Sequence, residues 1–257
     1  MTECTMQLAG KRVLITGGNR GIGFELAKAL AQRGARIAIC GRDKASLQRA
    51  AETIGPQTIA IMADLAEPDA CKFLTSEVLS AFGGLDILVN NAAVQMNYSF
   101  FGRDTSSLQK DIAREWEINF AGPAKLIATL IPALAQSGTE RNGSAIVNMG
   151  SGLALAPKRD AAIYCASKAA LRNFSRSLRY QAEEAAPGLR VLDVTLPLVN
   201  TDMTQGRGRG KIEPAKVARD VVHALETGRD DVLVGKARLF AWIMRLAPAI
   251  GYRMLRG

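Results

Sequence analysis

The sequence is almost without histidine. His223 is the only one among 257 residues, which excludes a zinc site built from histidines and leaves one residue for any Ser-His-Asp triad. Because His223 falls in a predicted helix, 214–227, far along the chain from the other candidate residues, we interpret it as a surface or packing residue. We expect no metal site.

Cysteine is scarce as well. The chain has four, Cys4, Cys40, Cys71 and Cys165, and no two of them form a C-x-x-C motif, so zinc-ribbon and thioredoxin-like sites are excluded. Four cysteines in a chain of this length do not indicate a disulfide scaffold. A reducing environment is the simpler interpretation, and we expect a cytoplasmic protein.

Long uncharged apolar runs are also missing. No stretch reaches about 18 such residues, so we expect no membrane-spanning helix. The N-terminal residues 1–8 are polar and lack the basic and apolar regions of a signal peptide.

Acidic residues are missing from residues 236–257, which carry five Lys or Arg among many apolar side chains. The formal net charge of the chain is +9, and residues 204–257 hold 11 Lys or Arg against 5 Asp or Glu. This basic, amphipathic tail suits peripheral contact with an anionic membrane surface, packing against a neighbouring subunit, or covering the chain's own active site. We favour packing. Nucleic-acid binding is not predicted, because the charge comes without a reading motif.

Seven short apolar runs alternate with helical patterns. The predicted strands are 11–16, 35–40, 57–63, 85–90, 143–150, 189–196 and 230–235, and the predicted helices are 24–33, 44–54, 68–82, 107–136, 161–186 and 214–227. This rhythm indicates repeated βαβ units. We predict one α/β domain over residues 1–257, a Rossmann-type, doubly wound, seven-stranded parallel sheet with helices on both faces, ending in the basic tail.

A glycine-rich segment, TGGNRGIG at residues 16–23, lies between the first strand and the first helix. Glycines let the backbone turn sharply and approach a pyrophosphate, and the helix N-terminus supplies free N–H groups. The segment therefore predicts a dinucleotide site that involves Gly17, Asn19, Arg20, Gly21, Ile22 and Gly23.

Arg42 follows the second strand, where an acidic residue would bind the ribose 2′-OH and select NAD(H). An arginine there can bind a 2′-phosphate, and Arg20 can reach the same phosphate from the glycine loop. We therefore predict NADP(H) rather than NAD(H). The alternative is that both arginines are solvated and Asp43 turns inward.

Polar residues follow the third and fourth strands. Asp64 can accept a hydrogen bond from the adenine amino group, and Asn90 faces the same crevice. Either residue could instead form an Asx turn.

The reactive centre is predicted at Tyr164 and Lys168, which share one face of a helix through their i, i+4 spacing. A neighbouring ammonium stabilises a phenolate, so the tyrosine can exchange a proton with a substrate oxygen. Ser151 follows the fifth strand and can bind the same oxygen. Asn119, in the preceding long helix, can hold a water beside Lys168.

These residues together resemble the short-chain dehydrogenase/reductase family. The order of TGGNRGIG, Asp64, Asn90-Asn91-Ala92, Asn119, Ser151, Tyr164-x-x-x-Lys168 and Pro197…Thr201 is similar to that of the family from about residue 8 to residue 235. Three segments, 91–95, 151–157 and 164–171, resemble its DltE-like branch. Two positions depart from the family pattern, because Ala93 and Leu198 stand where glycine is usual.

The resemblance implies a Rossmann-type oxidoreductase with an Asn-Ser-Tyr-Lys tetrad at Asn119, Ser151, Tyr164 and Lys168. Tyr164 would be the acid and base, and Lys168 would lower its pKa and bind the nicotinamide ribose. The resemblance also implies a homodimer or homotetramer built on the two long helices. Further cofactor contacts are expected from Leu65, Asn91, Ala92, Pro197, Val199 and Thr201.

The predicted substrate pocket is mostly apolar, which favours a hydrophobic ketone or aldehyde. Candidates for its lining are Gln95, Met96, Tyr98, Leu153, Leu155, Val199 and Met203, and the alternative is that several of them pack the core. The loop 205–211 is either a lid or a solvated segment. We predict an NADP(H)-dependent oxidoreductase that transfers hydride between nicotinamide and a carbonyl or alcohol. A non-catalytic NADP(H)-sensing protein with the same fold is the alternative.

Overall fold

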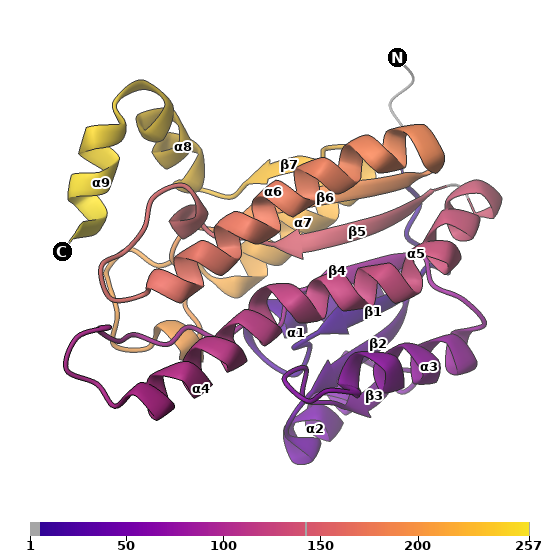
Figure 1. The fold of residues 1–257 in the computed structure, drawn as a ribbon. Helices are drawn as coiled ribbons and strands as arrows, with labels where there is room; N and C mark the ends of the chain where they lie inside the picture. The colour runs from indigo at the N-terminus through magenta and orange to yellow at the C-terminus, as the bar shows by residue number, and fades with distance from the viewer. Residues whose placement is uncertain (1–5, 142, 257) are drawn as a thin grey trace.

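A parallel sheet of seven strands runs through the computed structural model, which describes residues 6–141 and 143–256 (Figure 1). The strands are β1 (Arg12–Thr16), β2 (Arg36–Gly41), β3 (Ile59–Met62), β4 (Ile87–Asn90), β5 (Ser144–Met149), β6 (Leu189–Thr195) and β7 (Asp231–Leu233). Their order is β3-β2-β1-β4-β5-β6-β7, with every neighbouring pair parallel. The strand order reverses between β1 and β4, because β2 and β3 lie on one side of β1 and all later strands lie on the other. A crevice is therefore expected at the carboxyl ends of β1 and β4.

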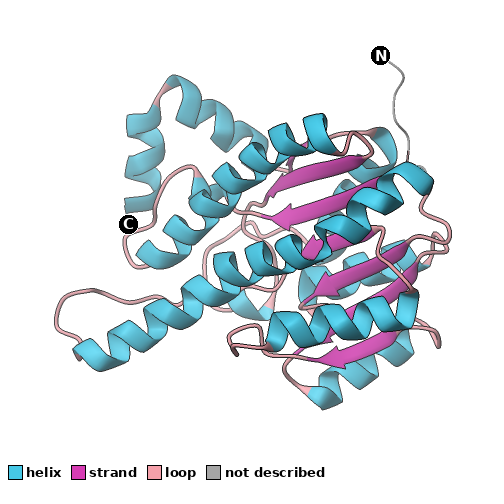
Figure 2. Ribbon diagram, turned by 45° about the vertical axis from the view of Figure 1, so that its right-hand side comes forward, coloured by secondary structure: helices cyan, strands magenta, loops and turns pink. Residues whose placement is uncertain are grey.

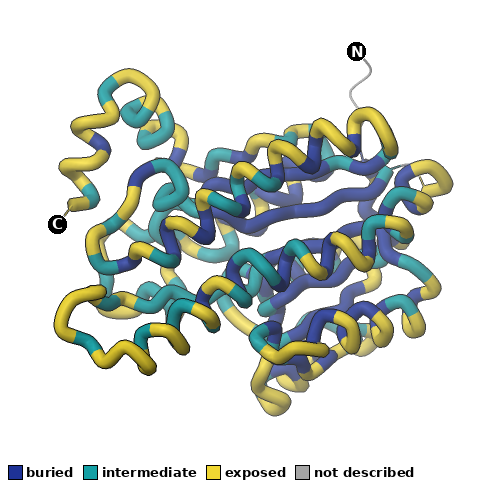
Figure 3. The backbone as a smooth tube through the Cα atoms, in the orientation of Figure 1, coloured by how far each residue is buried: buried dark blue, intermediate teal, exposed yellow. Residues whose placement is uncertain are grey.

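Helices cover both faces of the sheet (Figure 2). They are α1 (Gly21–Ala31), α2 (Lys44–Ile54), α3 (Ala70–Phe82), α4 (Thr105–Trp116), α5 (Gly122–Glu140), α6 (Ala162–Ala185), α7 (Pro214–Thr227), α8 (Ala237–Leu246) and α9 (Pro248–Arg256). Along β1, Val13 and Ile15 pack with α1, α2 and α7, whereas Leu14 packs with α3, α5 and α6. Two apolar layers therefore enclose the strands, which are buried in Figure 3, and the predicted fold class is confirmed.

The long helix predicted at 107–136 is interrupted by a π-helical turn. The turn, Glu117–Ala121, joins α4 to α5. By length and composition alone, the combined segment Thr105–Glu140 could cross a membrane. However, Leu126, Leu130 and Leu134 are fully buried against the sheet, so the apolar character of this segment reflects its place in the core.

The C-terminal tail folds into α8 and α9, which we call the C-terminal helix pair (residues 236–256). The pair stands away from the sheet beyond the carboxyl ends of the strands (Figure 1). A Cβ added at Gly251 would lie 2.1 Å from the Met244 sulfur, so the absence of a side chain at Gly251 lets the two helices pack closely. Much of the outer surface of the pair is exposed (Figure 3).

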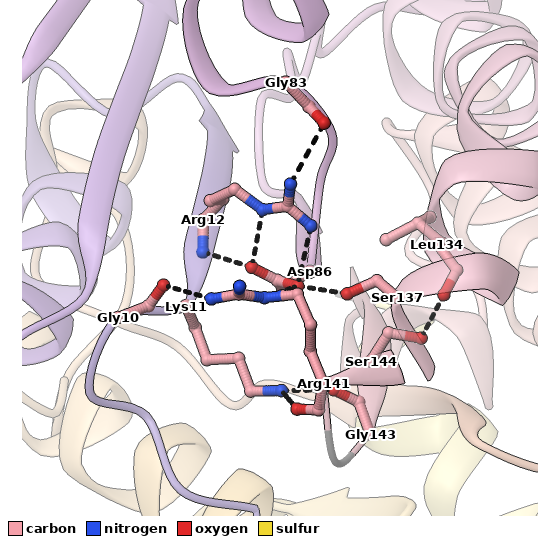
Figure 4. Close-up of polar contacts among 10 residues, drawn as sticks. All are labelled: Gly10, Lys11, Arg12, Gly83, Asp86, Leu134, Ser137, Arg141, Gly143 and Ser144. Carbon is pink, nitrogen blue, oxygen red and sulfur yellow. Dashed lines mark hydrogen bonds and ion pairs between the residues drawn. The ribbon is translucent and has the colours of Figure 1, made fainter. Parts of the chain in front are cut away.

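A buried carboxylate ties together the amino ends of β1 and β4 (Figure 4). Asp86 Oδ2 accepts hydrogen bonds from the Arg12 backbone N–H at 2.7 Å and from Arg12 Nε at 2.9 Å. Asp86 Oδ1 accepts from Arg12 Nη2, from Arg141 Nε and from the Ser137 hydroxyl. Burial alone would raise the pKa of Asp86, but hydrogen bonds from Arg12 and Ser137 lower it to about 2.

We predict that Asp86→Asn lowers the free energy of unfolding by about 2–4 kcal/mol at pH 7, since the amide leaves the Arg12 guanidinium without its counter-charge. The folded-state pKa lies below that of the unfolded chain, so the carboxylate stabilises above about pH 4 and loses this effect as the pH falls toward 2. Urea unfolding at several pH values checks both points. Glu226→Gln, which removes an exposed partner of Arg33, is the control and should cost less than about 1 kcal/mol.

Candidate active site

The turn after β1 depends on glycine, as two of its positions show. Gly17 has a φ of +64°, and a Cβ at Gly23 would lie 2.4 Å from the Gly17 carbonyl oxygen. The amide of Asn91 supports the turn by donating to the carbonyls of Thr16 at 2.9 Å and Gly17 at 3.2 Å. The Thr16 hydroxyl accepts from the backbone N–H of Asn91 and of Ala92. The first turn of α1 is thereby held close to the ends of β1 and β4.

A cavity of about 1120 Å³ follows the carboxyl edge of the sheet. Its wall brings together most of the predicted cofactor residues: Gly17, Asn19, Arg20, Gly21, Ile22, Arg42, Asp64, Leu65, Asn91, Ala92, Pro197, Val199 and Thr201. Gly23 is absent from the wall, because it lies behind the loop against Gly17. The glycine turn, the N-terminus of α1 and an elongated cavity fit a dinucleotide.

The two predicted phosphate-binding arginines differ in their surroundings. Arg42 is exposed at the end of β2 and has no ion-pair partner in the described part of the chain. Arg20 forms an ion pair with Asp202 at 3.0 Å, and both side chains are about two-thirds exposed. Such a pair contributes little to stability, so Arg20 can exchange it for a phosphate. Asp43 Oδ1 accepts from Ser46 N–H and caps α2, and Asp43 also lines the cavity next to Arg42.

The polar residues after β3 and β4 also separate into two roles. Asp64 lines the cavity, accepts from Ala66 N–H and pairs with Arg114 at 2.8 Å. Burial would raise the pKa of Asp64, but hydrogen bonds from Arg114 and Ala66 lower it. Asn90 is buried and donates to Asn148 Oδ1 at 2.8 Å. Asn90 therefore belongs to the polar core beneath the site, while its neighbour Asn91 lies on the cavity wall.

Ser151, Tyr164 and Lys168 meet on the cavity wall. Lys168 is 3% exposed, and its Nζ donates to the Met149 carbonyl at 2.9 Å. The same Nζ lies 5.9 Å from the centre of the Tyr164 ring. Ser151 favours the ionised form of Tyr164, and its hydroxyl accepts from Leu153 N–H at 3.1 Å. Helix α6 and the end of β5 thus place a phenol, an alcohol and an ammonium on the wall of the same cavity.

Burial moves the two titratable groups of this cluster in opposite directions. It raises the pKa of Tyr164 to about 12, against the opposite effect of Ser151, so the expected lowering of this pKa by Lys168 is not found in the coenzyme-free protein. It lowers the pKa of Lys168 to about 8, against the negative charge of Asp193. Asp193 forms an ion pair with Arg172 at 2.9 Å, and none of the described carboxylates forms an ion pair with Lys168. The site therefore keeps a desolvated cation beside a protonated phenol at neutral pH.

Asn119 is fully buried in the π-helical turn, and its amide is engaged by the protein itself. Its Oδ1 accepts from Val94 N–H at 2.9 Å, and its Nδ2 donates to the Val94 carbonyl at 2.8 Å. A longer contact of 3.3 Å reaches the Ser167 hydroxyl. Asn119 thus holds the segment after β4 against α6, and the predicted water beside Lys168 stays a prediction.

The cavity wall also bears on the alternatives left open for the C-terminal tail. Gln95, Leu153 and Met203 belong to this wall, whereas Leu155 lines a second cavity of about 980 Å³ under α9, and substrate contact by these residues stays a prediction. The tail covers part of the cavity, which was one of the alternatives, through apolar side chains of the C-terminal helix pair that were not individually assigned to the site: Leu239, Phe240, Ile243, Met254 and Leu255. Their amphipathic spacing was visible in the sequence, but the surface on which they would lie was not.

Arg207 also reaches this cavity, from the loop that was expected to be a lid or a solvated segment. Its Nη1 is buried without a hydrogen-bond partner, and its charge favours the ionised form of Tyr164, whose pKa burial raises. The loop therefore contributes a cation to the wall.

We predict that Lys168→Met raises the free energy of unfolding by about 1–3 kcal/mol, because it removes a desolvated charge from the interior. The folded-state pKa of Lys168 lies below its unfolded value, so wild-type stability should also rise as the pH goes from about 8 to 10.5, and the variant should lack this contribution. Chemical unfolding without coenzyme measures both effects. Exposed Lys216→Met should change stability by less than about 0.5 kcal/mol, and destabilisation by Lys168→Met would contradict the interpretation.

Comparisons with known proteins agree with this geometry. A profile of the short chain dehydrogenase family matches residues 11–211. The uncharacterized oxidoreductase DltE of Bacillus subtilis (strain 168) is 36% identical over 200 residues, which cover 78% of this chain and 76% of that protein.

Two solved structures have the same fold and hold a dinucleotide. A short chain dehydrogenase from Burkholderia cenocepacia J2315 in complex with NADP is 28% identical, with a TM-score of 0.82 over 98% of this chain and 100% of that one. A 3-ketoacyl-(acyl-carrier-protein) reductase from Brucella melitensis complexed with NADH is 25% identical, with a TM-score of 0.76 over 88% and 96% of the two chains. As the sequence predicted, the chain belongs to the short-chain dehydrogenase/reductase family, in its DltE-like branch, and is an oxidoreductase.

Proposed function

We propose that this oxidoreductase uses NADP(H) to reduce an apolar ketone or aldehyde, with Tyr164 as the proton donor. The observation that carries the proposal is the meeting of Ser151, Tyr164 and Lys168 on the wall of a cavity that also passes the glycine turn and Arg42. The cavity fits a dinucleotide lying along the sheet edge with its reactive end beside the phenol.

The burial of Tyr164, which favours the protonated phenol, supports reduction as the direction. With a pKa of about 12, Tyr164 is protonated at neutral pH and ready to act as an acid. When bound, the reduced nicotinamide supplies hydride to the carbonyl carbon. The Tyr164 hydroxyl gives its proton to the carbonyl oxygen while Ser151 donates a hydrogen bond to the same oxygen. Lys168 stabilises the phenolate that remains, because its charge is buried nearby.

The cofactor preference rests on the end of β2. Arg42 is exposed there without an ion-pair partner, and Asp43 is engaged in capping α2. A 2′-phosphate would find the unpaired Arg42 guanidinium here, whereas a 2′-OH would have to share the Asp43 carboxylate with the cap of α2. Arg20 is available from the opposite side once its exposed pair with Asp202 opens.

The substrate class rests on the apolar wall beyond Tyr164. Leu153, Met203, Phe240 and Ile243 belong to the cavity wall, to which Arg207 adds a cation. Burying apolar substrate surface there contributes about 25 cal/mol per Å², which favours a hydrophobic carbonyl compound over a small polar one.

We predict that Tyr164→Phe lowers kcat at least 100-fold for NADPH-dependent reduction of a hydrophobic ketone, since no other hydroxyl on the wall combines with a buried ammonium in this way. NADPH binding, followed by fluorescence titration, should change less than about threefold. The exposed Tyr180 lies on the same helix, and Tyr180→Phe is the control. If the wild-type protein binds NADPH but reduces none of a panel of ketones and aldehydes, the non-catalytic sensing protein becomes the better interpretation.

We predict that Arg42→Asp weakens NADPH binding about 10- to 100-fold, the range expected for lost charge-assisted hydrogen bonds to a phosphate. NADH binding should be unchanged or improved, because a carboxylate can accept from a ribose 2′-OH. Calorimetric titration with both coenzymes measures the ratio. Arg49→Asp, an exposed change on α2, controls for net charge, and equal losses for NADPH and NADH would show that the preference lies elsewhere.

A further inference from the structure

The C-terminal helix pair exposes a large amount of apolar surface. Six of its large apolar side chains are at least half exposed: Leu239, Trp242, Leu246, Ile250, Tyr252 and Met254. In α8, Leu239, Trp242 and Leu246 follow helical spacing and share one side. Folded proteins usually scatter such side chains singly, so a cluster of this kind marks an interaction surface.

The same helix pair is purely basic. Lys236, Arg238, Arg245, Arg253 and Arg256 are all exposed, and among residues 236–256 there is no Asp or Glu. None of the five forms an ion pair with another described residue, and Arg245 lies over the Trp242 ring at 5.9 Å from its centre. Unpaired cations beside exposed apolar and aromatic side chains are the composition of a helix that lies in a membrane interface.

The inner face of the pair is already occupied. Phe240, Ile243 and Leu255 line the cavity, while Leu239 and Met254 take part in the cavity wall and are also more than half exposed. The exposed apolar side chains on the outside are therefore not needed to close the protein's own core. Figure 3 shows the outer side of α8 and α9 exposed, at the end of the molecule where the strands terminate.

We propose that the C-terminal helix pair docks on an anionic lipid surface, with the exposed Trp242, Leu246 and Ile250 among the lipid chains and Arg238 and Arg245 at the phosphates. Charge favours lipid over a second copy of the chain, because a symmetric contact would bring the same five cations of both copies together without a carboxylate between them. A homodimer built on the long helices would leave this surface free. Docking would place the rim of the cavity, at Leu239 and Met254, against the membrane.

The test uses sedimentation of the full chain with vesicles of phosphatidylcholine alone or with 30% phosphatidylglycerol. Wild-type protein should bind the anionic vesicles at least tenfold more tightly than the neutral ones. Arg238→Gln with Arg245→Gln should weaken binding about 10- to 50-fold, since each cation near an anionic surface contributes about a fivefold gain. Leu246→Ser with Ile250→Ser should weaken it at least tenfold.

Matched controls distinguish the effect of this surface from a general effect of charge or hydrophobicity. Arg49→Gln and Tyr180→Ser change an exposed cation and an exposed aromatic on α2 and α6, and both should leave vesicle binding within twofold of wild type. Circular dichroism should show unchanged folding for every variant. Equal binding of wild type to neutral and anionic vesicles, or equal loss in the controls, would overturn the proposal.

Trp242 provides a second measurement on a nearly unaltered protein. The chain has two tryptophans, so Trp116→Phe leaves Trp242 as the only tryptophan, and its fluorescence can be followed by itself. Anionic vesicles should shift its emission to the blue, and brominated lipid chains should quench it. A blue shift that grows with protein concentration in the absence of lipid, together with a doubling of mass in light scattering, would assign the surface to a second copy and overturn the proposal. NADPH binding should be retained throughout, so the result does not depend on the proposed reaction.

Discussion

A cation buried beside a phenol is the interaction on which the reactive centre depends. Lys168 has one strong contact, to the Met149 carbonyl, and its charge is otherwise desolvated. A buried charge of this kind destabilises the folded chain, because the interior solvates it poorly. The two apolar layers around the sheet supply the stability that tolerates it. The same desolvation strengthens the effect of the ammonium on a phenolate formed at Tyr164.

The amino and carboxyl ends of the strands form two edges of the sheet, which have different roles. At the amino edge, the Asp86 cluster joins β1, β4 and the end of α5 with short polar contacts (Figure 4). At the carboxyl edge, glycine and small residues leave the strand ends open, and a cavity runs along them. The Asp86 cluster fixes the amino ends of the strands and so holds the strands in register. The side chains that follow the carboxyl ends are thereby positioned, and the cavity there stays open.

The cavity joins regions that are far apart in the chain. The glycine turn, Arg42 and Asp64 come from the first half of the sequence, whereas Phe240, Ile243 and Leu255 come from the last twenty or so residues. The C-terminal helix pair therefore has two faces with separate roles. One face lines the cavity, and the other is exposed, apolar and basic. A surface that meets lipid and also forms the wall of an apolar cavity would bring such molecules close to Tyr164.

The sequence by itself determined the βαβ order, the glycine turn, the cation at Arg42 and the pairing of Tyr164 with Lys168. These features depend on local periodicity, on backbone freedom or on i, i+4 spacing, all of which can be read within a few residues. Tertiary structure decided what Asn90, Asn119 and Arg20 contact, because Asn148, Val94 and Asp202 lie far from them in the chain. It also decided that α8 and α9 line the cavity, and that Tyr164 and Lys168 titrate far from their usual range. The burial of a side chain depends on how the sheet and both helix layers pack together, and a short stretch of sequence does not determine this packing.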